Sequence, residues 1–226
     1  MRFFVFFFLT LLRVDFLTCP AEASGLIIMR HGEAEHNVLH TFNADPTSSN
    51  YREVHLTDKG ILQVKDAALK LSSTGLRDQN VRAIYASPLP RTRETAQLVM
   101  KSLSISANKL TNTKSIIENR VGTWEGKSEN DFDRTYSHGN RTHAHDYGGE
   151  TDEDVMARVS ALLNRILDEC KKNSNVIIVS HGTPSALMLK YLKHIIPDPG
   201  LPTAGYVEIP WDEIYRNFPK KCHPTK

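Results

Sequence analysis

Histidine and arginine residues that could bind and react with an anion occur at three points along the chain. Arg30-His31-Gly32-Glu33 contains one of each, Ser180-His181-Gly182 contains a second histidine, and Arg91 ends the run Ser87-Pro88-Leu89-Pro90-Arg91. Guanidinium groups match phosphate oxygens in two-point contacts, and an imidazole can serve as a nucleophile. Each histidine precedes a glycine and a helical pattern, so backbone N–H groups there, including that of Gly182, are expected to face the same anion. Together these residues predict a cationic pocket for a phosphate group.

Each of these groups follows a short, nearly continuous apolar run. Such runs predict strands buried on both faces of a sheet, at Leu26-Ile27-Ile28-Met29, Ala83-Ile84-Tyr85-Ala86 and Val176-Ile177-Ile178-Val179. Amphipathic helices are predicted from Thr57 or Asp58 through Leu71, from about Arg91 to Leu103, from about Thr151 to Cys170, and after Pro184. Ligands bind at the carboxyl ends of the strands in such sheets, so the histidines and arginines are expected to meet there.

The alternation of strands and helices predicts an α/β fold, specifically a three-layer αβα sandwich with a mostly parallel central sheet. Neither a repeat nor a linker-like stretch interrupts the pattern, so residues 24–226 are predicted to form a single domain. The segment at about 126–148 differs, because it is polar, aperiodic and rich in Asn, Asp, His and Arg. A long loop of this kind predicts either a lid over the active site or a mobile region.

The composition is ordinary for a globular protein, with 226 residues, 40% of them hydrophobic and 24% charged. Lys plus Arg is 28 against 26 for Asp plus Glu, a net charge of +2, so no concentrated basic face for nucleic acid is expected. A mean hydropathy of −0.37 excludes a polytopic membrane protein. The expected partner is a small phosphorylated substrate, with the oligomeric state left open. Whether Cys170 and Cys222 pair is also left open.

Residues 1–23 predict a cleaved secretory signal. An apolar run covers residues 3–12, and Ala21-Glu22-Ala23 has the small-x-small pattern of a signal peptidase site. The run is too short to remain as a membrane anchor, so no stable membrane insertion is expected after cleavage. The predicted location is secreted or periplasmic. Arg13 and Asp15 interrupt the stretch before the cleavage site and leave open a cytoplasmic protein with a short N-terminal extension.

Arg30-His31-Gly32-Glu33 with Asn37 resembles the RHGE-x-x-x-N signature of the histidine phosphatase superfamily, which includes cofactor-dependent phosphoglycerate mutases and fructose-2,6-bisphosphatase. RHG alone is a weak match, but six segments in order over roughly residues 25–190 are highly specific. The other five are Leu56-Thr57-Asp58-Lys59-Gly60, Ser87-Pro88-Leu89-Pro90-Arg91-Thr92 with Thr95-Ala96, Glu118-Asn119-Arg120-Val121-Gly122 with Trp124-Glu125-Gly126, Gly149-Glu150-Thr151, and Val179-Ser180-His181-Gly182.

The resemblance implies a role for each matching residue. His31 would be the nucleophile that takes the phosphoryl group and forms phosphohistidine. Glu118 would protonate the leaving alcohol and then activate the water that clears the intermediate, with Glu125 as the nearby alternative acid. No metal and no other cofactor is implied. The oxygens of the transferring group would be held by Arg30, Asn37, Arg91 and His181.

His36 and His40 lie at an i, i+4 spacing that could bind zinc on one helix face. No nearby carboxylate completes a ligand set. A solvated helix face is therefore predicted for both histidines.

Within the family, the sequence favours a phosphomonoester hydrolase acting on a small phosphorylated metabolite. A mutase must retain a bisphosphate intermediate, whereas the segment 126–148 is net negative with neutral histidines and is shorter than a mutase insertion. A cofactor-dependent phosphoglycerate mutase remains one alternative. The other is a catalytically inactive phosphate-binding or regulatory module, which is disfavoured because neither the nucleophile nor an arginine is missing.

Overall fold

The computed structural model describes residues 24–136, 142–169, 174–195 and 200–219. At its centre is one sheet with the strand order β3-β2-β4-β1-β5, in which only β5 is antiparallel to its neighbour. The predicted α/β fold with a mostly parallel sheet is confirmed. The strands are β1 (Gly25–Arg30), β2 (Val81–Ala86), β3 (Leu110–Asn112), β4 (Asn175–Ser180) and β5 (Tyr206–Pro210).

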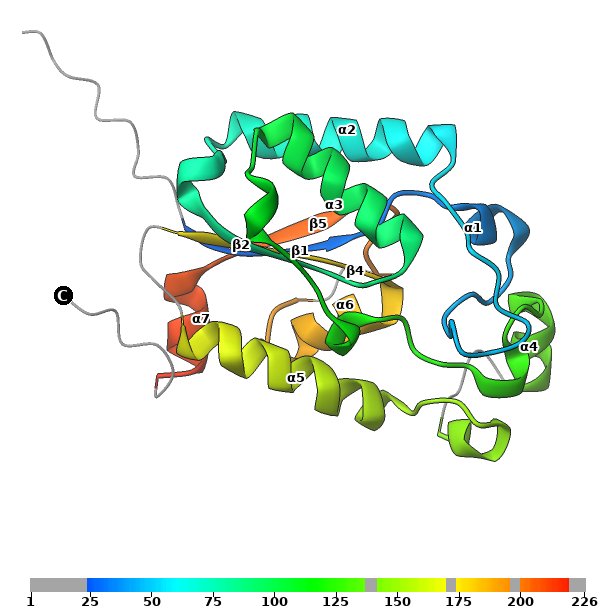
Figure 1. Ribbon diagram of the computed structural model, residues 1–226. Helices are drawn as coiled ribbons and strands as arrows, with labels where there is room; N and C mark the ends of the chain where they lie inside the picture. Colours follow the sequence, from blue (N-terminus) through cyan, green and yellow to red (C-terminus); the bar gives the residue numbers. More distant parts are fainter. Residues whose placement is uncertain (1–23, 137–141, 170–173, 196–199, 220–226) are drawn as a thin grey trace, which may run out of the picture.

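Helices cover both faces of the sheet (Figure 1). One face carries α2 (Asp58–Ser73) and α3 (Pro90–Leu103), and the other carries α5 (Asp152–Asp168), α6 (Gly182–Tyr191) and α7 (Trp211–Asn217). The short helices α1 (Glu35–Leu39) and α4 (Glu129–Thr135) lie together beyond one end of the sheet. Single 3₁₀ turns are found at Asp78–Asn80, Ala107–Lys109, Lys114–Ile116, Gly122–Trp124 and Ala144–Tyr147.

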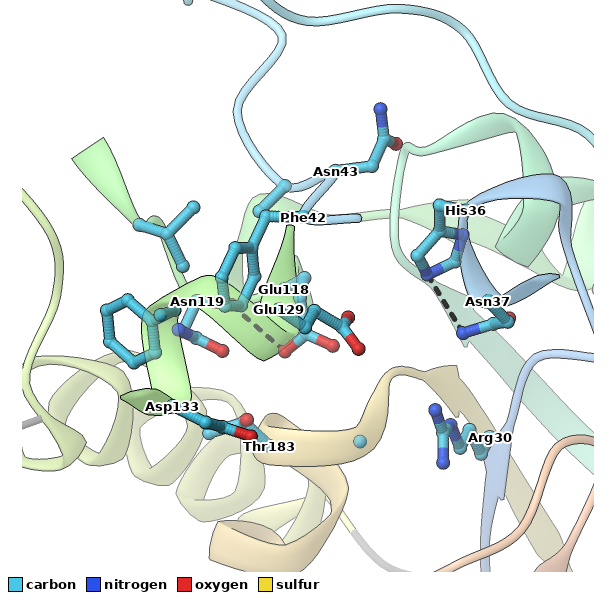
Figure 2. Close-up of a pocket in the computed structure, with 14 residues that line it drawn as sticks. Arg30, His36, Asn37, Phe42, Asn43, Glu118, Asn119, Glu129, Asp133 and Thr183 are labelled. Atoms are coloured by element: carbon cyan, nitrogen blue, oxygen red, sulfur yellow. Dashed lines mark hydrogen bonds between the residues drawn. The ribbon is translucent and has the colours of Figure 1, made fainter. Parts of the chain in front are cut away.

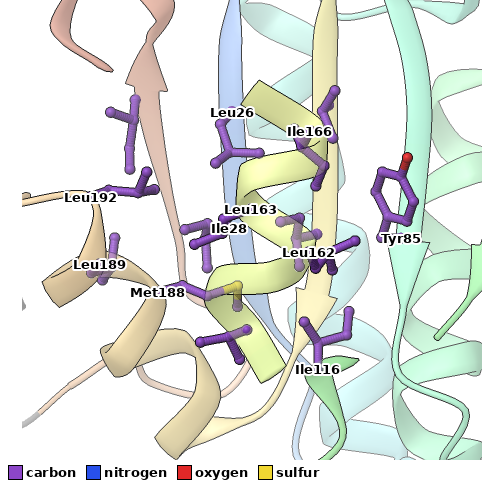
Figure 3. Close-up of a cluster of buried hydrophobic side chains, with 14 of the residues drawn as sticks. Leu26, Ile28, Tyr85, Ile116, Leu162, Leu163, Ile166, Met188, Leu189 and Leu192 are labelled. Carbon is purple, nitrogen blue, oxygen red and sulfur yellow. The ribbon is translucent and has the colours of Figure 1, made fainter. Parts of the chain in front are cut away.

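The apolar strand sequences follow from this arrangement, because alternate side chains of one strand enter different cores. On β1, Leu26 and Ile28 pack with Leu163 and Ile166 of α5 (Figure 3). Ile27, the residue between them, packs with the residues of α2 and α3 on the opposite face. Burying one such side chain contributes about 1.5–3 kcal/mol to the free energy of unfolding. Because the side chains on both faces of β1 are buried, both favour a strand placed between two layers of helices.

Helix starts are set by the residues that the sequence indicated. The Thr57 hydroxyl accepts a hydrogen bond from the Gly60 N–H at 3.0 Å, and Thr151 caps α5 in the same way. Gly60 also lies against the loop that follows β1, where a side chain could not fit. A Cβ atom built there would lie 1.9 Å from the Glu33 carbonyl oxygen. The start of α2 therefore fixes the position of the residues around His31.

The segment 126–148 has more structure than an aperiodic loop in its described part. Ser128 caps α4 by accepting from the Asp131 N–H, and Phe132 of that helix is buried. Phe132 packs with Phe42, Trp124 and Tyr147 in a small aromatic core of its own. This core needs few apolar residues, and two of its six members, Phe42 and Trp124, come from outside the segment, so helical periodicity within the segment is weak.

Several predicted features fall on residues outside the described ranges. They are the secretory signal at 1–23 and the cysteines Cys170 and Cys222. In the part of the chain that is described, no helix has the length and apolar character required to cross a bilayer.

Candidate active site

The register of β1 and β4 brings the two histidines together. Arg30 pairs with Ser180 in the parallel ladder, so His31 and His181, one residue further on, leave the sheet side by side. Their rings lie edge to face, with centroids 5.2 Å apart, and both are buried. The His31 N–H donates to the Ser180 carbonyl at 3.0 Å, which ties the two loops at their start.

The His31 ring has a defined tautomer. Its Nδ1 lies 2.7 Å from the Gly32 carbonyl oxygen, which can only accept, so Nδ1 carries the hydrogen. Nε2 therefore keeps its lone pair and accepts a hydrogen bond from Arg91 Nε at 3.2 Å. Thr95 supports this loop because its hydroxyl accepts from the Gly32 N–H at 3.2 Å. The ring is thus oriented with the nucleophilic nitrogen toward the guanidinium.

Arg91 at the start of α3 is completely buried, at 0% exposure. Asn43 holds the far edge of its guanidinium: Nη1 donates to the Asn43 side-chain oxygen at 2.8 Å and Nη2 to the Asn43 carbonyl at 2.6 Å. Glu125 in turn accepts from the backbone N–H groups of Ala44 and Asp45 at 2.9–3.3 Å. Glu125 is 1% exposed and does not line the cavity described below, and its carboxylate anchors the backbone at Ala44 and Asp45.

His181 is the N-cap residue of α6, and only one of its two ring nitrogens has a hydrogen-bond partner among the described residues. Its Nε2 lies 2.7 Å from the Ser87 hydroxyl, whereas the buried Nδ1 has no hydrogen-bond partner among the described residues. Gly182 follows as the first residue of α6 and packs near Arg30, where a Cβ would lie 3.7 Å from the guanidinium carbon. A side chain at 182 would therefore enter the space between α6 and Arg30.

A cavity of about 250 Å³ opens next to this cluster (Figure 2). Four of the predicted site residues line it, namely Arg30, Asn37, Glu118 and Gly182. The other three are buried beside it: Arg91 donates a hydrogen bond to His31, and the ring of His181 packs against that of His31. The structure therefore brings all seven predicted residues to the carboxyl end of the central strands.

The prediction of a solvated face for His36 is wrong. The residue is only 7% exposed, lines the cavity and lies 5.5 Å from the His31 ring, centroid to centroid. Its Nε2 lies 3.1 Å from the Asn37 side-chain nitrogen, and its Nδ1 is buried without a partner among the described residues. The helix α1 is so short and so close to the sheet edge that one of its faces turns to His31. His40, at the left-handed C-cap, is exposed as predicted.

The cluster keeps its histidines neutral. Burial, with the Arg91 charge next in importance, lowers the pKa of both His31 and His181 well below the usual value. The same causes lower the pKa of His36 to about 2. Burial also lowers the pKa of Arg91 to about 10, which still leaves it protonated at neutral pH. The site thus combines fixed guanidinium charge with neutral imidazoles that can act as a nucleophile or donate hydrogen bonds.

Sequence reasoning missed three residues of this site: His36, Asn43 and Glu129. Glu129 of α4 lines the cavity beside Glu118, and Asp133 follows one turn later (Figure 2). The spacing of Glu129 and Asp133 by four residues was the available signal for one helix face. Nothing in the sequence marked Asn43, because its contact with Arg91 joins residues that are 48 positions apart.

No group of three or more His, Cys, Asp or Glu side chains suited to hold a metal ion occurs among the residues that the structure describes. The lining of the cavity carries the guanidinium of Arg30 and the carboxylates of Glu118, Glu129 and Asp133, and the buried Arg91 lies close by.

A mostly parallel α/β sheet with two histidines and two arginines at its carboxyl edge defines a phosphate-handling class of protein, and residues 26–213 match the histidine phosphatase superfamily (branch 1). The chain belongs to this family.

Its relatives include both mutases and phosphatases. It is 25% identical over 181 residues, 76% of this chain and 83% of the relative, to a 2,3-bisphosphoglycerate-dependent phosphoglycerate mutase of Azorhizobium caulinodans. Among solved structures, YhfR of Bacillus stearothermophilus is 25% identical with a TM-score of 0.60, covering 76% of this chain and 80% of that one. Mycobacterial glucosyl-3-phosphoglycerate phosphatase shares the fold, with a TM-score of 0.63 at 20% identity and coverage of 82% and 89%.

Proposed function

We propose that this protein is a phosphomonoester hydrolase that acts on a small phosphorylated metabolite through a phosphohistidine at His31. The observation that carries the proposal is the state of His31. The Gly32 carbonyl holds its Nδ1–H at 2.7 Å, so the lone pair is on Nε2, and the lowered pKa keeps the ring unprotonated at neutral pH. An oriented, neutral imidazole beside a buried guanidinium is suited to attack a phosphorus atom.

In the proposed first step, the Nε2 lone pair of His31 forms a bond to phosphorus while the bond from phosphorus to the alcohol oxygen breaks. Glu118, which lines the cavity, donates a proton to that oxygen. In the second step, water attacks the phosphohistidine and Glu118 takes its proton, so that inorganic phosphate leaves and His31 is regenerated. Arg91 must turn its Nε–H from His31 Nε2 to a phosphate oxygen as the substrate binds.

The phosphate oxygens find donors on several sides of this position. Arg30 lines the cavity with a buried Nε that has no partner in the described structure. Asn37 lines it as well: its side-chain oxygen accepts from the Ala34 N–H and one amide hydrogen faces His36, which leaves the second amide hydrogen for an oxygen. The unpartnered Nδ1 of His181 and the backbone N–H of Gly182 complete the set. Preorganised donors of this kind lower the barrier to phosphoryl transfer.

The proposal is tested by trapping the intermediate. The protein is mixed with labelled p-nitrophenyl phosphate and quenched in base, and acid-labile label is measured. Label is expected on the unmodified protein and on His55→Ala, whose histidine is exposed, pairs with Glu94 and does not line the cavity, and it should be absent from His31→Ala. Substantial label at another histidine of His31→Ala would refute the assignment. Vanadate binding without any turnover would indicate a phosphate-binding module instead.

A phosphoglycerate mutase is the second candidate, because curated relatives carry that name. The charge of the cavity opposes it. Glu118, Glu129 and Asp133 line the wall away from Arg30, where the carboxylate or second phosphate of a phosphoglycerate would lie. Conversion of 3-phosphoglycerate to the 2-isomer, with and without 2,3-bisphosphoglycerate, distinguishes the two functions. A mutase rate that exceeds the rate of phosphate release would favour this candidate.

We also propose that residues 1–23 direct the protein to a secreted or periplasmic location. The apolar run and the Ala21-Glu22-Ala23 pattern support this proposal. Sequencing the N-terminus of protein isolated from its source tests it, with Ser24 expected as the first residue. An intact Met1 would refute cleavage.

A further inference from the structure

The cavity has two chemically different ends. Arg30, His36 and Asn37 lie on one side, and the carboxylates of Glu118 and Glu129 lie across the opening from them (Figure 2). Asp133 adds a third carboxylate to the second side. Arg30 is the one cationic side chain in the described lining.

The carboxylates of Glu129 and Asp133 on α4 lack partners that neighbouring acids have, whereas Glu118 accepts a hydrogen bond from the Asn119 N–H at 3.1 Å. On the same helix, Asp131 pairs with Arg134 at 2.6 Å. Glu125, just before the helix, accepts from backbone N–H groups. By contrast, the carboxylates of Glu129 and Asp133 have no side-chain hydrogen bond or ion pair within the described residues. The two carboxylates without a hydrogen-bonded or ion-paired partner therefore lie where a ligand in the cavity would reach them.

Glu129 is the member of this group on which a ligand charge would act most. It is half-buried, and burial is the main cause that raises its pKa; the Glu118 and Asp133 carboxylates raise it further, and the charges of His40 and Arg30 oppose them only in part. A positive charge placed among these three groups would offset both the lost solvation and the mutual repulsion. Lys127 does not supply that charge, because its ammonium lies 5.3 Å from the centre of the Trp124 ring and outside the lining.

Two aromatic rings border the same end. Phe42 and Phe132 both line the cavity and meet edge to face, with centroids 5.2 Å apart. Aromatic rings attract alkylammonium groups through their negative faces, and a neighbouring carboxylate adds to that attraction. Carboxylates beside phenyl rings are therefore suited to an ammonium group on a short carbon chain.

The opposite end independently indicates an anionic group. His36 is more than nine-tenths buried and lines the cavity, and its Nδ1 lacks a partner in the described structure, as does the Nε of Arg30. Donors there and carboxylates across the opening fit one ligand with opposite charges at its two ends. From this arrangement we infer that the substrate is a phosphomonoester of an amino alcohol or amino sugar, with an ammonium group in the leaving alcohol. The inference rests on the proposed phosphatase function.

Three small substrates that differ in one group test the inference. They are 2-aminoethyl phosphate, 2-hydroxyethyl phosphate and phosphoglycolate, with p-nitrophenyl phosphate as the general substrate. We expect kcat/KM for the amine to exceed that for the hydroxyl compound by about fivefold, the upper ratio that a partly exposed ion pair supports. Phosphoglycolate, with a carboxylate at the same position, should be slower than the hydroxyl compound by a similar factor.

The variant Glu129→Gln assigns the preference to this wall, because it keeps the shape and removes the charge. The amine-to-hydroxyl ratio should fall at least twofold. Asp131→Asn is the matched control, since it removes one charge from the same helix at an exposed position outside the lining, and the ratio should stay unchanged.

Two results would overturn the inference alone, given normal turnover of p-nitrophenyl phosphate. One is phosphoglycolate cleaved as fast as the amine, and the other is a Glu129→Gln variant in which the ratio does not move. A protein that forms no phosphohistidine from any of the four substrates would refute the phosphatase function itself, and the inference with it.

Discussion

Replacing Arg91 by lysine should disable the site while leaving its net charge unchanged. The guanidinium uses all three of its nitrogens: Nε donates to His31 at 3.2 Å, and Nη1 and Nη2 donate to Asn43 at 2.8 and 2.6 Å. A lysine ammonium is a compact point charge and cannot reproduce a planar fork that spans two residues. It can remain near Asn43 or move toward the phosphate, but one nitrogen cannot occupy both positions.

Losing the hydrogen bonds of Arg91 should lower both the free energy of unfolding and the rate of phosphohistidine formation. A hydrogen bond from a charged donor contributes about 1.5–3 kcal/mol, so losing one or two of the buried contacts should lower the free energy of unfolding by about 2–6 kcal/mol. Removing one preorganised donor to developing charge slows a reaction by about 10²–10³-fold. We therefore expect phosphohistidine formation in Arg91→Lys to slow at least a hundredfold. Asn43→Ala removes a single support of the guanidinium and should cost about tenfold.

The assay is rapid-quench measurement of phosphohistidine from p-nitrophenyl phosphate, together with urea unfolding of each variant. Arg93→Lys is the matched control, because Arg93 is exposed on the same helix and does not line the cavity beside His31. It should retain the unmodified rate and stability. If a folded Arg91→Lys variant formed phosphohistidine within threefold of the unmodified rate, the buried guanidinium would not be the group that binds the transferring phosphoryl.

Three other outcomes follow from the same geometry. His36→Phe should weaken vanadate binding about fivefold or more and raise KM more than it lowers kcat, because the Asn37 amide loses the acceptor that orients it. An unchanged Kd for vanadate would contradict this role of His36. Glu118→Gln should slow alkyl phosphates by about 10²–10⁴-fold while p-nitrophenyl phosphate, whose leaving group needs no proton, loses far less; equal losses in the burst phase would rule out the acid role. Because the pKa values of His31, His36 and His181 are lowered in the folded protein, these residues bind more protons in the unfolded chain below pH 6.5. Together they should lower the free energy of unfolding by about 3 kcal/mol between pH 6.5 and 5.5, about 1 kcal/mol for each histidine, while His55, whose pKa is raised by Glu94, acts in the opposite direction. In urea titrations at the two pH values, His36→Phe should lose about a third of this dependence, and an undiminished dependence would show that the histidine is not buried in the neutral form.

The strands and long helices could be predicted because their signals are local. A run such as Val176-Ile177-Ile178-Val179 is apolar at every position because it is covered on both faces, and the capping threonine of α2 lies directly before the first helical turn. The ends of parallel strands share one edge, so the topology alone was enough to bring His31 and His181 together. Each histidine precedes a glycine, and Arg30 and Arg91 lie at or just after strand ends, so the sequence alone indicated a phosphate site.

Tertiary contacts decided what the other residues do. Glu125 and Glu118 are both acids in matching family segments, yet one is tied to the backbone of Ala44 and Asp45 and the other lines the cavity. Their different positions depend on how the chain folds back between residues 81 positions apart, and no local pattern records such a distance.

His36 and Glu129 show the same limit from the opposite side. The sequence by itself placed His36 on a polar helix face and Glu129 in a polar, aperiodic segment, and both patterns favour exposure. The fold places both at the cavity, because α1 and α4 lie beside the carboxyl edge of the sheet. Residue types and their local spacing therefore determined the reaction class, since phosphate chemistry needs particular side chains at strand ends. The orientation of His31, the hydrogen bonds that hold Arg91 and the charge of the cavity wall opposite Arg30 came from long-range packing, because each depends on where two distant segments meet.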